Sequence, residues 1–88
     1  MDQKILEKSY TGFEFEFITE LSNNELKRKL EKLLDKRIVI TDKYHSDITP
    51  TSRMFKIEPD FSAGPNGREL ITGPIPYLEA VDVFEKIT

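Results

Sequence analysis

The chain has 88 residues, a formal net charge of −3 and no cysteine. This length corresponds to one domain, which we expect to span residues 1–88. The lack of cysteine excludes a disulfide framework, a thiolate metal site and a cysteine nucleophile. The charge balance lacks the basic excess of nucleic-acid-binding proteins, and no apolar run reaches the roughly 20 residues of a membrane span. We therefore expect a cytoplasmic protein without a nucleic-acid or membrane partner.

The first predicted element is a strand over residues 10–18, where three phenylalanines alternate with Gly12, Glu14 and Glu16. Alternation of period two places the aromatic rings on one face and the carboxylates on the other. The pattern has two interpretations. It is an ordinary amphipathic strand with glutamates facing water, or the two carboxylates hold a hard cation. Gly12, on the carboxylate face, would let a ligand or a backbone segment approach closely.

A helix is predicted next. Ser22 and Glu25 form a capping box, and leucines then recur at helical spacing up to about Lys36. The β-branched run at residues 38–40 predicts a short strand, and the polar segment 41–52 predicts a loop. This loop contains the single histidine, His45, which we interpret as an exposed loop residue.

The second half of the chain predicts two more strands and a helix. Arg53 to Glu58 is a strand candidate that should end near Pro59. Asn66-Gly67 predicts a hairpin turn, after which residues 68–72 return as a strand. Pro76 suits the first turn of a helix. The apolar stripe expected on this helix comprises Leu78, Val81, Val83 or Phe84, and Ile87.

The predicted order is therefore β-α-β-β-β-α. It indicates an α+β fold with a small, mostly antiparallel sheet of three or four strands and two helices on one face. So thin a sheet indicates either a truncated chain or a partner that supplies a missing layer. A homo-oligomer or a partner chain is accordingly expected.

Three segments, in this order, resemble the amidoligase branch of the glutamine synthetase-like carboxylate–amine ligases. The first is Gly12-Phe13-Glu14-Phe15-Glu16-Phe17. The second is Lys56-Ile57-Glu58-Pro59-Asp60-Phe61-Ser62, with one more residue before the aspartate than the family pattern has. The third is Glu69-Leu70-Ile71-Thr72-Gly73-Pro74, which leads into the last helix. The resemblance covers roughly residues 10–87.

The resemblance implies part of a half-barrel fold and a site for magnesium and ATP. Glu14, Glu16 and Glu69 match metal ligands of the family, and Asp60 and Ser62 match residues that line the neighbouring cofactor pocket. The implied reaction is ATP-driven amide formation from a carboxylate and an amine through an acyl phosphate. Family members are much longer, so we expect the N-terminal part of such a ligase or a truncated homologue, not catalytic alone, and assign no catalytic residue.

Two other functions stay open. The chain is alternatively a non-enzymatic interaction or assembly module that retains a ligase-like half-domain, of the kind a phage or mobile element encodes. It is otherwise a simple cation-binding or regulatory domain. The ligase hypothesis predicts that Glu14, Glu16 and Glu69 converge on one concave face of the sheet.

Overall fold

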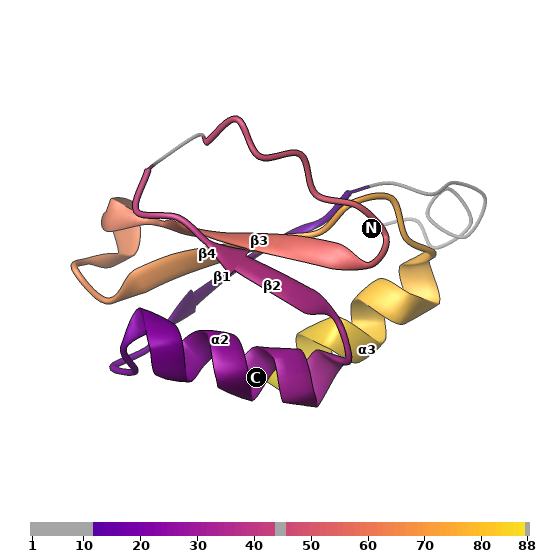
Figure 1. The fold of residues 1–88 in the computed structure, drawn as a ribbon, viewed down its shortest axis with the longest axis horizontal. Helices are drawn as coiled ribbons and strands as arrows, with labels where there is room; N and C mark the ends of the chain where they lie inside the picture. The colour runs from indigo at the N-terminus through magenta and orange to yellow at the C-terminus, as the bar shows by residue number, and fades with distance from the viewer. Residues whose placement is uncertain (1–11, 44–45, 88) are drawn as a thin grey trace.

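The computed structural model describes residues 12–43 and 46–87, which form one four-stranded sheet and two α-helices (Figure 1). The predicted strand over residues 10–18 begins outside the described residues, and His45 also lies outside them. The strands lie in the order β1 (Glu14–Ile18), β4 (Gly67–Ile71), β3 (Met54–Pro59) and β2 (Arg37–Ile40). The α+β class and the predicted order of elements are thus confirmed. The sheet is mixed, because β2 pairs with β3 in parallel while the other pairs are antiparallel.

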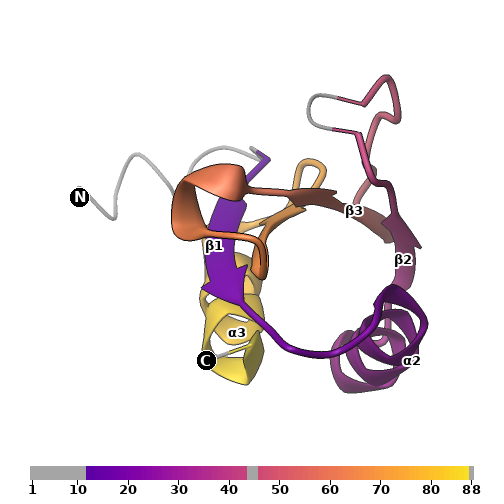
Figure 2. The same ribbon diagram turned by 90° about the vertical axis from the view of Figure 1, so that its left-hand side faces the viewer.

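Both helices, α2 (Asn23–Leu34) and α3 (Tyr77–Ile87), cover the same face of the sheet, as predicted (Figures 1 and 2). The sheet arches over them, and the core fills the space between. Burial of this apolar surface is the main source of stability for a domain without disulfides. The core residues are Leu26, Leu30, Leu34, Ile38, Phe55, Ile57, Leu70, Ile75, Ala80 and Val83.

The capping box predicted for α2 is present. The Ser22 side chain accepts a hydrogen bond from the backbone N–H of Glu25, and the Ser22 hydroxyl donates to the Glu25 carboxylate. The helix ends at Leu34, two residues earlier than predicted, because Asp35 takes a left-handed conformation with φ of 54°. That conformation stops the helix and turns the chain directly into β2.

The predicted apolar stripe of α3 is only partly correct. Ala80 and Val83 are buried, whereas Leu78 is 70% exposed and Phe84 is 51% exposed. This helix has apolar residues on more than one side, so spacing alone does not fix its rotation. Burial of Ala80 turns Leu78, which lies on the opposite side of the helix, outward. Phe84 lies on the same side as Ala80 and contacts Phe15 of β1 while half of it stays exposed.

The connection between β2 and β3 lies on the face opposite the helices, as the described parts of residues 41–53 show in Figure 1. Parallel neighbours cannot be joined by a tight turn and need a crossover connection. Because the helices cover one face, this connection crosses the other. It therefore meets the charged outer face of the sheet. Among the described residues, no helix is long and apolar enough to cross a membrane.

Candidate functional site

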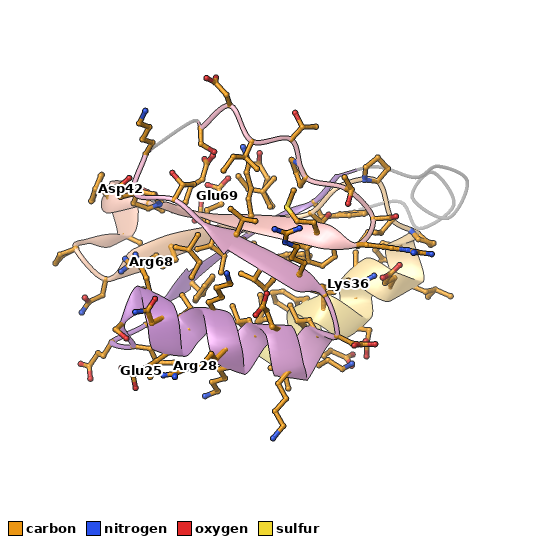
Figure 3. All side chains as sticks on the ribbon, viewed as in Figure 1. Glu25, Arg28, Lys36, Asp42, Arg68 and Glu69 are labelled. Carbon is orange, nitrogen blue, oxygen red and sulfur yellow. The ribbon has the colours of Figure 1, made fainter. Side chains whose placement is uncertain are left out.

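A row of three glutamates crosses the outer face of the sheet. Glu16 on β1 lies opposite Glu69 on β4, and Glu69 lies opposite Glu58 on β3. Directly paired residues on neighbouring strands project to the same face. In Figure 3, Glu69 lies on the side of the sheet away from the helices. The face that carries no helix is thus strongly acidic.

The carboxylates of Glu16, Asp60 and Glu69 come together, each offering an oxygen within 4.8 Å of the others. We call these three residues the acidic cluster. The short distance between the carboxylates of Glu16 and Glu69 follows from the register of β1 and β4. Hydrogen bonds from Thr72 N to Phe13 O and from Thr19 N to Asn66 O set the bonding pattern of β1 and β4. Glu16 and Glu69 then form a pair without mutual backbone hydrogen bonds, the kind in which side chains approach most closely.

Asp60 is the most unusual member of the acidic cluster. It is only 5% exposed, and its Oδ1 accepts hydrogen bonds from the backbone N–H and the hydroxyl of Ser62. Its Oδ2 is buried and has no hydrogen-bond partner among the described residues. A buried carboxylate oxygen without a donor costs free energy unless a proton or cation accompanies it.

The turn after β3 holds Asp60 in place. The predicted hairpin is confirmed, because β3 and β4 are antiparallel and the Gly67 N–H donates to the Gly64 carbonyl across a turn that contains Asn66. The connection is longer than this turn, since it also contains a short 3-10 helix, η1 (Phe61–Ala63). The Asp60 N–H donates to the Gly67 carbonyl at 3.0 Å. A Cβ at Gly67 would collide with the Asp60 carbonyl oxygen, so glycine is required for this close approach.

The pKa of Glu69 is raised by its surroundings, which include several other carboxylates. Burial raises its pKa above the usual value of 4.5, and the nearby carboxylates of Glu14, Asp60 and Glu16 raise it further. A hydrogen bond with Glu14 acts in the same direction. Like charges at close range favour binding of a proton or a cation between them. Glu14 is therefore an electrostatic neighbour of the acidic cluster.

Glu58 belongs to the same row of glutamates but forms an ion pair with Lys56. Its Oε2 lies 2.9 Å from Lys56 Nζ and accepts hydrogen bonds from the N–H and hydroxyl of Ser46. Burial alone would raise the pKa of Glu58, but these bonds outweigh it and lower the pKa to about 2. Lys56 also donates to the Ser46 carbonyl. These hydrogen bonds hold the β2–β3 connection against the sheet. Because Glu58 Oε2 already contacts Lys56 and Ser46, Glu58 is less available as a metal ligand.

The acidic cluster has the chemistry of a site for a hard divalent cation. Magnesium and calcium prefer carboxylate oxygens at about 2.0–2.6 Å, so two ligands of one ion lie at most about 5 Å apart. The mutual limit of 4.8 Å satisfies that condition. The rigid strand positions of Glu16 and Glu69 would fix an ion without large side-chain movement.

The structure thus brings together three of the five predicted site residues, Glu16, Asp60 and Glu69. Glu14 is adjacent to them, and Ser62 orients Asp60 through hydrogen bonds. The metal and cofactor roles of these residues stay predictions. A metal-ligand role for Asp60 and the Lys56–Glu58 pair were not predicted from the sequence. The alternation of Glu58 and Asp60, like that of Glu14 and Glu16, was the available signal for a shared face.

The expected concave face is not where the carboxylates lie. Glu16 and Glu69 share one face, but Figure 2 shows the sheet arched around the helices, so this face is the outer side of the arch. The cause is the position of the helices, since apolar side chains of the sheet must contact them and the charged side chains point outward. Gly12 also has a structural explanation, because a Cβ there would lie 2.9 Å from the Thr72 carbonyl oxygen.

Comparisons with protein-family models, curated proteins and solved structures found no match to this chain. The resemblance to the amidoligases therefore rests on the three sequence segments alone.

Proposed function

We propose that this chain binds a magnesium ion at Glu16, Asp60 and Glu69, as the metal-holding part of an ATP-dependent carboxylate–amine ligase. The observation that carries the proposal is the buried Asp60 Oδ2, which has no hydrogen-bond partner among the described residues and belongs to a carboxylate that lies close to two others. The raised pKa of Glu69 supports it, because a cation would relieve the same crowding.

Each residue has a distinct task in this proposal. Glu16 and Glu69 would supply carboxylate oxygens from neighbouring strands, and Asp60 would supply Oδ2, the oxygen that Ser62 does not bond. When bound, magnesium offsets the negative charge of ATP phosphates during phosphoryl transfer. The class of reaction that the sequence resemblance implies is amide formation between a carboxylate and an amine. Because the acidic cluster lies on the convex face of the sheet and not on the predicted concave one, residues outside this chain would have to enclose the nucleotide and complete the enzyme.

The test is thermal unfolding with magnesium, with ATP, with both and with neither. Magnesium at about 100 times its dissociation constant should stabilise the protein by about 2.7 kcal/mol, and ATP should add to this effect only when magnesium is present. Asp60→Asn should abolish both effects because it removes the charge but keeps the size. Glu20→Gln, an exposed residue outside the acidic cluster, is the matched control and should respond as the wild type does.

The outcomes separate the open hypotheses. Stabilisation by magnesium with no further effect of ATP would contradict the ligase assignment and leave a cation-binding domain. No stabilisation by magnesium, or an equal response from Asp60→Asn, would contradict the metal site itself. The alternative function, an interaction or assembly module, is favoured by a separate observation, since β1 is an edge strand of the sheet in the described part of the chain.

A further inference from the structure

We propose that the outer edge of β1, together with the groove beneath it, binds an extended segment of another protein in which basic and apolar residues alternate. The proposed edge shares Glu16 with the acidic cluster but does not require a bound metal ion. It rests on the backbone of β1, an apolar groove and the charge of two glutamates.

The first observation is an open backbone edge. β1 is the terminal strand of the sheet and has β4 as its one neighbour in the described part of the chain. The hydrogen bonds of Phe13 with Thr72 and of Thr19 with Asn66 show which residues of β1 turn their backbone toward β4. The residues between them turn their N–H and C=O groups outward. These residues are Glu14, Glu16 and Ile18.

The second observation is an apolar groove under that edge, with a volume of about 410 Å³. Figure 2 shows α3 beneath β1. Phe84 of α3 is 51% exposed, and its ring centroid lies 5.8 Å from that of Phe15 on β1. A strand added beside β1 would direct alternate side chains onto this surface. The groove is lined by Phe13, Glu14, Phe15, Tyr77, Ala80, Val81 and Phe84.

The third observation, charge, selects the occupant. The side chains of Glu14 and Glu16 are exposed on the outer face of β1, although Glu14 also borders the groove. They lie beside the positions that the remaining side chains of an added strand would occupy. Lysine or arginine at those positions would pair with the glutamates, whereas acidic residues would be repelled. A second copy is disfavoured, because β1 beside β1 would place glutamates next to glutamates. The glutamates therefore act against self-pairing of this edge and in favour of a basic partner.

The probe for the test is a short blocked peptide that alternates lysine and valine. On its addition, the backbone amides of Glu14, Glu16 and Ile18 should shift in NMR spectra and exchange more slowly with solvent. A glutamate–valine peptide should not bind. A lysine–valine peptide N-methylated along one edge should also fail, which separates strand addition from simple charge attraction without changing the protein.

Substitutions on α3 test the groove. Phe84→Ala should weaken peptide binding about tenfold, the scale of a buried aromatic anchor. Leu78→Ala is the matched control, since Leu78 is 70% exposed on the same helix and does not line the groove, and it should change the affinity less than about twofold. The proposal would be overturned by no binding, by equal binding of the acidic or N-methylated peptide, or by concentration-dependent self-pairing through β1.

Discussion

Glu58 and Glu69 lie opposite each other on β3 and β4, on the same outer face, yet their surroundings move their pKa values in opposite directions. The pKa of Glu58 falls to about 2, whereas that of Glu69 rises. Burial raises the pKa of both. The difference is in the partners, since Glu58 has Lys56 and Ser46 while Glu69 has three other carboxylates nearby.

This contrast distinguishes a structural carboxylate from a candidate functional one. The pair of Glu58 with Lys56 is satisfied within the fold and secures a connection that crosses the sheet. The acidic cluster is not satisfied within the described fold, because Asp60 Oδ2 has no donor there. Groups that need a ligand to balance them are characteristic of functional sites.

The largest effect is expected for Glu58→Gln. Lys56 is 8% exposed and would keep its charge without its carboxylate partner, a loss of about 3 kcal/mol or more. Urea unfolding at neutral pH measures it, with Glu20→Gln as the control for loss of one negative charge. Since the pKa of Glu58 falls from 4.5 to about 2, its stabilising contribution is complete above pH 4.5 and is lost as pH falls toward 2. A variant as stable as the wild type at neutral pH would show that the pair is not structural.

The local patterns of the sequence predicted most elements of this fold. Alternation located β1, and Ser22 with Glu25 located the start of α2. Rotation of α3 and the path between β3 and β4 were not predictable in the same way. The rotation of α3 depends on which of its apolar side chains pack into the core. The path between β3 and β4 depends on the close approach of Gly67 to Asp60.

The candidate site was only partly predictable, because local patterns show which residues of one strand share a face but not which strands become neighbours. Alternation shows that Glu14 and Glu16 share a face, but strand order and register decide which other carboxylates join them. Alternation along β3 likewise shows that Lys56 and Glu58 share a face, but the further hydrogen bonds of this pair come from Ser46, which belongs to a crossover connection. No local pattern in the sequence encodes where such a connection passes.

A smaller loss is expected for Ser46→Ala, which removes the hydroxyl donor to Glu58 at 2.8 Å but keeps the backbone donor. Hydrogen bonds to charged groups contribute about 1.5–3 kcal/mol, so a loss near the lower value is expected. The pKa of Glu58, followed by NMR, should rise because one stabilising donor is gone. Ser52→Ala, an exposed serine of the same connection, is the control. Equal effects of the two substitutions would mean that the Ser46 hydroxyl has no special role.

The smallest change, and the one of opposite sign, is expected for Glu69→Gln in the presence of a chelator. The raised pKa of Glu69 means that the folded protein holds its proton more tightly than the unfolded chain does. The wild type therefore has this stabilising contribution below pH 4.5 and loses it as pH rises through the raised pKa. Glu69→Gln removes that loss, so the variant should be more stable at neutral pH by up to about 1 kcal/mol, with the difference vanishing near pH 4.5. Adding magnesium should reverse the order, because the wild type gains a ligand that the variant binds poorly. If Glu69→Gln were less stable than the wild type at neutral pH without divalent cations, the prediction would be wrong. The fold itself would then stabilise the ionised form of Glu69, as it does that of Glu58.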